Sequence, residues 1–113
     1  MRLNHDLIRL ILLEAEDEEP VDLSPYSEEQ IAYHKAQLIE AGYVKGFIHV
    51  GLGGMIGADV EDLTWAGHQF LANARNELFW KKAMRQLAKA GGSACIDIIY
   101  ALLATVASYM LLN

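Results

Sequence analysis

The hydrophobic positions near the N-terminus recur with the spacing of an amphipathic helix. Four of them form one stripe at i, i+1, i+4 and i+5: Leu7, Ile8, Ile11 and Leu12. Asn4 precedes the stripe and is a suitable N-cap. We therefore expect a largely buried first helix that ends in the run 14–20, because neighbouring carboxylates there repel one another. We interpret this run as a solvated loop; the alternative is an acidic recruitment patch.

A second helical pattern begins at Ser27 and ends at Gly42. Ser27 and Gln30 have the spacing of a capping box, in which each side chain bonds the other residue's amide. Ile31 and Leu38 are seven residues apart and share a face, and Gly42 can adopt the positive φ of a C′ residue. The preceding segment 21–26 follows Pro20, contains Pro25 and has room only for a short extended piece or one helical turn.

The residues after Gly42 change from a helical to a β-prone pattern. Two β-prone runs follow, one at residues 43–50 and one in the last residues of the stretch 47–63. They flank four glycines: Gly51, Gly53, Gly54 and Gly57. We interpret the stretch 47–63 as a β-hairpin with a glycine tip. A phosphate-binding loop is disfavoured, because no Gly-Lys-Ser/Thr follows. Helix, glycine stop and hairpin follow one another as in the recognition helix and wing of a winged helix-turn-helix.

The C-terminal third is expected to be helical. Thr64 can cap a helix over 65–76, and a second helix is expected over 78–90 with its basic residues on the polar side. Gly91-Gly92 should break that helix, and Ser93 can cap a last helix over 94–112. The polar side of the 78–90 helix carries Lys81, Lys82, Arg85 and Lys89.

The last helix is apolar on nearly every side and must therefore be covered on every side. Residues 98–112 span roughly 22 Å, short of a ~30 Å hydrocarbon core, so burial in a membrane is not expected. We predict a homodimer built on this helix, with a tail anchor as the alternative. The candidate interface residues are Ile99, Leu102, Leu103, Val106 and Met110.

Four segments together resemble a known family: YSEEQIAYH at 26–34, LIEAG at 38–42, LTWAGHQFL at 63–71 and FWK at 79–81. They are similar to domain of unknown function 2513, a family of small bacterial and phage proteins. The resemblance spans roughly residues 1–100, and LTWxGHxFL is its most specific part. It implies a winged-helix-like fold and brings no activity and no catalytic residues.

The predicted fold is α+β and mainly α. It consists of a winged helix-turn-helix-like core with a two-stranded wing and added C-terminal helices. We divide the chain into a winged-helix-like domain at residues 1–76 and a helical extension for packing or dimerisation at 77–113. The lone Cys95 and the absence of a signal-peptide pattern indicate a reducing, cytoplasmic location.

No residue pattern points to catalysis. The four histidines lack the i, i+4 spacing of a zinc helix, and no nucleophile–base–orienter set is recognisable, so we expect no enzyme, metal or cofactor. We interpret His68 as a structural histidine that forms hydrogen bonds at the start of a helix. We interpret Cys95 as a buried structural cysteine, and the aromatic residues Trp65, Phe70, Phe79 and Trp80 as core or interface.

Two functions follow from the predicted fold. The first is a DNA-binding transcriptional regulator, favoured by the likeness to winged-helix regulators. The second is a protein–protein interaction module, favoured by the net charge of −6, because basic patches supply most of the affinity for nucleic acid. The candidate contacts for either partner are Gln30, Tyr33, Gln37, Lys45 and His49.

Overall fold

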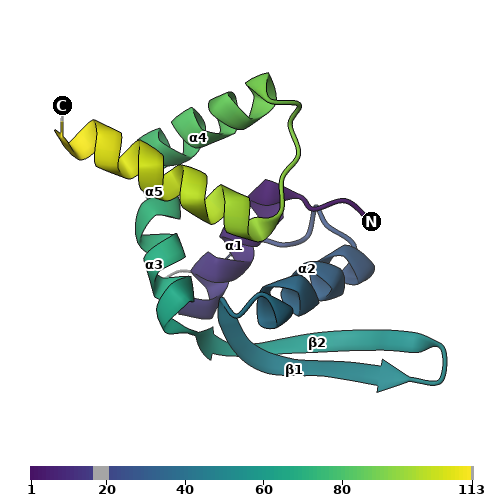
Figure 1. Cartoon of the computed structure of the whole chain (residues 1–113). Helices are drawn as coiled ribbons and strands as arrows, with labels where there is room; N and C mark the ends of the chain where they lie inside the picture. The colour runs from purple at the N-terminus through teal and green to yellow at the C-terminus, as the bar shows by residue number, and fades with distance from the viewer. Residues whose placement is uncertain (17–20, 113) are drawn as a thin grey trace.

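The computed structural model describes residues 1–16 and 21–112, and they form five helices and one β-hairpin (Figure 1). The fold is mainly α with a two-stranded antiparallel sheet, as predicted. In chain order the elements are α1 (His5–Glu16), α2 (Glu28–Glu40), β1 (Val44–Gly51), β2 (Gly54–Leu63), α3 (Trp65–Ala74), α4 (Glu77–Lys89) and α5 (Ile96–Leu112).

Helix α1 lies in the middle of the molecule, with its predicted stripe buried. The Asn4 side-chain oxygen accepts a hydrogen bond from the amide of Leu7 at 3.0 Å, which confirms the predicted cap. The helix continues to Glu16, two residues past the predicted start of the acidic loop. The rest of that run, 17–20, lies outside the described residues. Residues 24–26 form a turn, closed by a hydrogen bond from the Tyr26 amide to the Leu23 carbonyl.

Helix α2 has the predicted ends. Both bonds of the capping box between Ser27 and Gln30 are present at 3.0 Å, and Gly42 has φ +83°. From Gly42 the chain reverses, and the hairpin runs along α2, with its tip extending past the start of that helix (Figure 1). Because α2 contacts the hairpin on one side and α1 on another, most of its side chains are at least partly buried.

The hairpin pairs Val44 with Leu63 at its base and Gly51 with Gly54 at its tip, which confirms the predicted antiparallel pairing. Two bulges interrupt the register, one after Lys45 and one after His49. Residues 52 and 53 form the turn, and Gly54 has φ +113°. The tip is therefore shorter than predicted, because Gly57 lies within β2 opposite His49.

The same hydrophobic core contains residues from both predicted segments, so it does not divide at residue 76. Leu7 and Phe70 from the first segment pack in one cluster with Trp80, Ile99 and Leu103 from the second. Polar contacts join the same two segments: Trp80 Nε1 donates to Asp6 at 3.2 Å, and the Tyr43 hydroxyl donates to Asp97 Oδ1 at 2.6 Å. Helices α4 and α5 are thus an integral part of the fold.

Two details of the C-terminal helices differ from expectation. Helix α5 begins at Ile96, two residues later than predicted. The Cys95 carbonyl, just before the helix, accepts a hydrogen bond from the Ile99 amide at 3.1 Å. Trp65, expected in the core or an interface, is 78% exposed at the start of α3.

Within the described residues, none of the helices combines the length and the apolarity that crossing a membrane requires.

Candidate functional site

The three contact residues predicted on α2 are not freely presented. The Gln30 side chain is used in the capping box, Tyr33 is half-buried with its ring edge-to-face on His34, and Gln37 lies in a small depression near the start of α5. Glu28, Glu29 and Glu40 are the exposed positions along α2, whose whole length is described. The solvent-facing side of this helix is therefore acidic.

The two contact residues predicted on the hairpin are exposed, but each lies beside a carboxylate. His49 Nε2 and Asp59 Oδ2 are 2.6 Å apart across the strands, and Lys45 pairs with Asp62 in the register. The exposed face of β2 also carries Glu61. Because carboxylates outnumber cations here, the hairpin continues the acidic character of α2.

The distal end of the hairpin, defined here as residues 47–56, is apolar and exposed. Val50 is 71% exposed and Ile56 is 75% exposed. Leu52 stands in the turn itself, where neither α2 nor any other described helix covers it. Contiguous exposed apolar patches often mark interaction sites. The exposed apolar side chains of this end are Phe47, Val50, Leu52, Met55 and Ile56.

The five candidate interface residues on α5 separate into two groups. Ile99, Leu103 and Val106 are buried in the protein's own core, so they are not available to a second molecule. Leu102 and Met110 are partly buried at its edge. The outward face instead presents a stripe with alternating spacings of four and three residues. We call it the outer stripe: Ile98, Leu102, Thr105, Tyr109 and Leu112.

The interpretations of His68 and Cys95 were wrong. The His68 side chain is exposed, and only its backbone amide takes part in the start of α3, donating to the Thr64 carbonyl at 2.9 Å. Cys95 is an exposed free thiol, because it lies in the α4–α5 connection before α5 enters the core. The structural histidine is His34, which is fully buried and bonded through both ring nitrogens.

His34 could have been recognised from its position on α2. It is four residues before the buried Leu38 and four after Gln30, so it lies on the side of the helix that faces α1. A polar ring at such a position needs two backbone partners, and the chain supplies them from Gln30 and Asn4. Among the described residues, no group of three His, Cys, Asp or Glu side chains lies close enough together to hold a metal ion.

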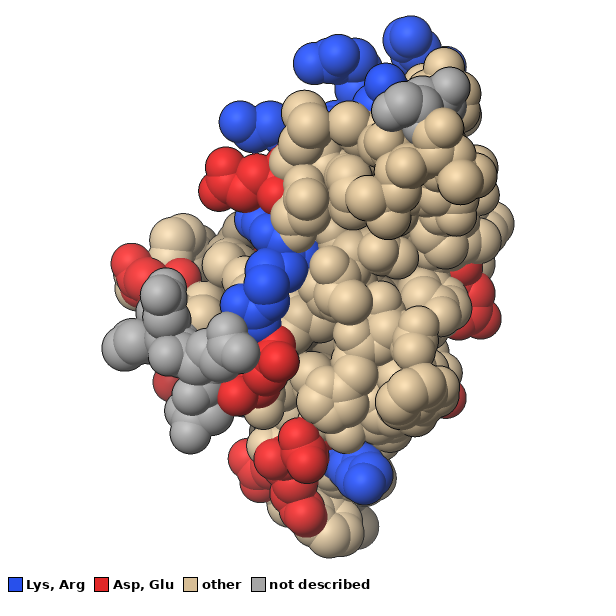
Figure 2. Space-filling view, turned by 90° about the vertical axis from the view of Figure 1, so that its left-hand side faces the viewer, with Lys and Arg blue, Asp and Glu red and all other residues tan. Residues whose placement is uncertain are grey.

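Charge is unevenly distributed over one face of the molecule. Figure 2 shows Lys and Arg side chains gathered at the top of this face, at the height of α4, and mostly Asp and Glu side chains at the bottom, at the height of the hairpin. Further charged side chains of both signs follow its left side between the two ends, and a broad uncharged area covers the middle and right. The basic end includes Lys81, Lys82, Arg85 and Lys89 of α4.

The family model described as hypothetical protein DUF2513 matches residues 2–93. The chain belongs to the DUF2513 family. A relative in Haemophilus influenzae (strain ATCC 51907 / DSM 11121 / KW20 / Rd), described as an uncharacterised protein, is 29% identical over 118 residues. The alignment covers 98% of this chain and 99% of the relative. No solved structure matches the chain.

The DUF2513 match includes α1, α2, the hairpin, α3 and α4, and it ends before α5. The hairpin and the basic helix therefore belong to the part of the chain that the family model describes. The outer stripe lies beyond that part, although the Haemophilus influenzae relative aligns along it.

Proposed function

We propose that this DUF2513 protein is a winged-helix-like interaction module that binds a protein partner through the distal end of its hairpin. The observation that carries the proposal is the gathering of exposed apolar side chains at residues 47–56. The hairpin extends beyond α2, as a wing does, and so presents these side chains to a partner without obstruction. Exposed apolar side chains gathered in one patch are a feature of protein–protein interaction sites.

The surroundings of the apolar end indicate the chemistry of the partner. Asp59, Glu61 and Asp62 follow it along β2, and Glu28 and Glu29 are exposed at the start of the neighbouring α2. Electrostatic complementarity across an interface favours opposite charges at the rim. The partner surface should therefore be an apolar patch bordered by lysine or arginine side chains.

The alternative function is a DNA-binding regulator that presents α2 and the hairpin to duplex DNA. Its support is the order of elements, α2 followed by a wing-like hairpin. Against it, the exposed positions of α2 are glutamates, whose carboxylates repel the phosphates of DNA. The segment before α2 also provides a turn at 24–26 in place of the helix that usually precedes a recognition helix.

The test compares two exposed apolar positions on different elements. Leu52→Lys changes the hairpin tip, whereas Leu78→Lys makes the same change at an exposed position of α4. Both variants should keep the far-UV circular dichroism and the Tm of the wild type. In quantitative affinity capture from the source cells, Leu52→Lys should lose partners that Leu78→Lys retains, and their binding should be reproduced with purified protein.

The two functions are separated by a mobility-shift titration with duplex DNA. The interaction module should show no retarded complex at tens of micromolar protein in low salt, where electrostatic binding is strongest. The regulator would be established instead by two results together. Lys45→Glu or Gln37→Glu would abolish a retarded DNA complex, and Leu52→Lys would leave the capture of protein partners unaffected.

We also propose that two copies associate through the outer stripe of α5. Alternating spacings of four and three are those of a coiled-coil seam, and four of the five members are apolar. Leu112 is 85% exposed and Ile98 is 57% exposed, so the stripe is uncovered at both ends. A second copy supplies an identical stripe, which makes an isologous pairing self-complementary.

The dimer is tested by sedimentation equilibrium of the purified chain. The wild type should approach twice the monomer mass at high micromolar concentration, and Leu102→Glu should remain monomeric. Leu52→Glu makes the same change at the hairpin tip, away from α5, and serves as the control. Monomeric wild-type protein at that concentration contradicts the proposal, whereas partition of the intact chain into vesicles would identify lipid as the occupant of this face.

A further inference from the structure

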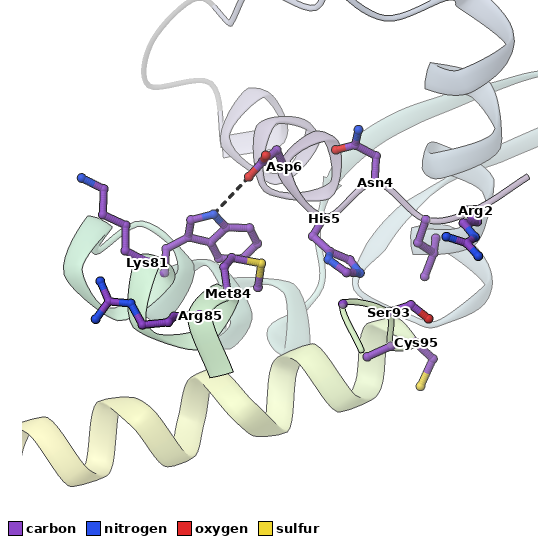
Figure 3. Close-up of a pocket in the computed structure, with 13 residues that line it drawn as sticks. Arg2, Asn4, His5, Asp6, Lys81, Met84, Arg85, Ser93 and Cys95 are labelled. Carbon is purple, nitrogen blue, oxygen red and sulfur yellow. Dashed lines mark hydrogen bonds between the residues drawn. The ribbon is translucent and has the colours of Figure 1, made fainter. Parts of the chain in front are cut away.

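The N-terminal segment, residues 1–4, contributes one wall of a cleft of about 1080 Å³ (Figure 3). The other walls are α4 and the α4–α5 connection. Figure 3 shows Arg2 and Asn4 on the side of the cleft opposite Lys81 and Arg85, whose charged ends point away from the hollow. The shape of this cleft therefore depends on where the N-terminal segment lies.

The N-terminal segment is tied to α2 by a hydrogen bond to a histidine. The Asn4 backbone amide donates to Nε2 of His34 at 2.7 Å. The side chain and the carbonyl of Asn4 bond instead to the amides of Leu7 and Ile8 in the first turn of α1. Before Asn4, Leu3 is partly buried and packs against the core. Without the bond to His34, the packing of Leu3 would be the main contact that keeps the segment in place.

The bond between Asn4 and His34 requires a neutral ring. The other ring nitrogen, Nδ1, is 2.7 Å from the Gln30 carbonyl, which can only accept, so Nδ1 carries the ring proton. Nε2 then has the free lone pair that accepts from Asn4. A second proton would have to bind Nε2, where it would meet the N–H of Asn4. Protonation of the ring and this hydrogen bond therefore exclude each other.

The surroundings of His34 do not stabilise a charged ring. Its side chain is fully buried, and burial lowers its pKa, although the bond to Gln30 opposes that shift. His5 on α1 also disfavours a second positive charge nearby, and Tyr33 on α2 places its ring edge-to-face with the imidazole. Neither ion pair found in the described part of the chain includes His34. A protonated ring would have to reach water.

We propose that the contact between Asn4 and His34 is a pH-sensitive switch that releases the N-terminal segment in mild acid. Nε2 faces the segment that bonds to it, so displacement of the segment both breaks the bond and exposes Nε2 to water. Acid favours this open form, by up to about tenfold in the ratio of open to closed molecules for each pH unit. The rest of α1 stays in place, because Leu7 and Ile8 are held by core packing.

Release of the segment changes the surface at this end of the molecule. Leu3 and Cys95 line both the cleft and a smaller depression beside Gln37, so the two hollows join when Leu3 leaves. Arg2 leaves the wall of the cleft at the same time, and Met84 on the opposite wall becomes more accessible. The shape and the charge that the cleft presents therefore differ between neutral and acidic pH. This switch is separate from the hairpin and from the outer stripe.

The switch is tested on the intact, ¹⁵N-labelled chain by two-dimensional NMR between about pH 7.5 and about pH 4.5. The ring nitrogens of His34 should report protonation with a midpoint below 6.5, and the Asn4 amide signal should move with the same midpoint. The order parameters of residues 2–4 should fall from about 0.85 to below about 0.6. The amide of Leu38 and those of the hairpin should keep their positions, because these elements stay packed.

Two variants separate His34 from the neighbouring histidine. His34→Gln should remove the pH-dependent transition of the segment, whereas His5→Gln should keep it and raise its midpoint slightly, because a like charge is lost. If His34→Gln does not fold, the coincidence of the two midpoints in the wild type remains the test.

Three outcomes would overturn the proposal. The first is a His34 ring that stays neutral, with the segment ordered, down to about pH 4.5. The second is a transition of the Asn4 amide that disappears in His5→Gln, which would assign it to the titration of His5. The third is a simultaneous change of all amide signals, which would indicate global unfolding in place of local release. None of these outcomes depends on whether the hairpin binds a partner.

Discussion

The backbone amide of Asn4 donates a hydrogen bond to Nε2 of His34 at 2.7 Å, joining the start of α1 to the middle of α2 across 30 residues. The other ring nitrogen, Nδ1, is 2.7 Å from the Gln30 carbonyl and must carry the proton of that bond. The ring is therefore neutral, with Nδ1 as donor and Nε2 as acceptor. Protonation of Nε2 would point two N–H groups at each other inside the core.

This arrangement makes stability depend on pH. Burial lowers the pKa of His34 below its ordinary 6.5, although the bond to Gln30 opposes the shift. Below pH 6.5 the unfolded chain binds a proton more readily than the folded one, so stability falls as the pH drops. The Tm should therefore be lower at about pH 5 than at about pH 7.5, with His34 as one contributor.

The variant His34→Gln isolates that contributor. It should cost about 1–3 kcal/mol at neutral pH, because a glutamine side chain cannot place a donor at the Gln30 carbonyl and an acceptor at the Asn4 amide as the two ring nitrogens do. The difference in Tm between wild type and variant should shrink toward pH 5, since the three other histidines are common to both proteins. A difference that stays constant over this range would show that His34 does not titrate as described.

The second prediction concerns the link between the hairpin base and α5. The Tyr43 hydroxyl donates to Asp97 Oδ1 at 2.6 Å, and burial together with this bond raises the pKa of Tyr43. Tyr43→Phe should lower the free energy of unfolding by about 1–2 kcal/mol, measured by urea denaturation. The double variant Tyr43→Phe, Asp97→Ala should lose less free energy of unfolding than the sum of the two single losses, because each single variant already removes the shared bond. Strict additivity would mean that the bond contributes nothing.

The third prediction concerns Gly67 in the segment most typical of the family. A Cβ at this position would overlap the Tyr43 carbonyl, which belongs to the chain backbone and cannot move aside cheaply. Gly67→Ala should therefore destabilise the protein by about 1–3 kcal/mol or more. Gly53→Ala is the matched control, since nothing lies near a Cβ there. Equal Tm values for the two variants would contradict the close approach of α3 to Tyr43.

The fourth prediction follows from the exposure of Cys95. An exposed thiol should react with a disulfide reagent such as Ellman's reagent in the folded protein, without denaturant. Cys95→Ser should abolish the reaction and leave the Tm unchanged, because the side chain is not part of the core. Reaction only after addition of guanidinium would restore the interpretation of Cys95 as a buried residue.

Local patterns in the sequence were sufficient to predict the elements and their ends. The capping box of Ser27 and Gln30 and the stop at Gly42 depend on contacts within one turn, so they are readable without the rest of the chain. The hairpin was predicted for the same reason, because β-prone runs flanking glycines specify a turn locally. The family could also be inferred, since each of the four segments that carried the resemblance is contiguous in the sequence.

Only the tertiary structure decided which faces those elements bury. Helix α5 is apolar on nearly every side, so its sequence could not show that Ile99, Leu103 and Val106 join the core while Ile98 and Leu112 remain outside. The position of His34 on α2 is readable locally, but its partner at Asn4 lies 30 residues away, which no local pattern encodes. One core cluster contains Leu7 and Leu103 from distant parts of the chain, and their proximity is a property of the packed fold alone.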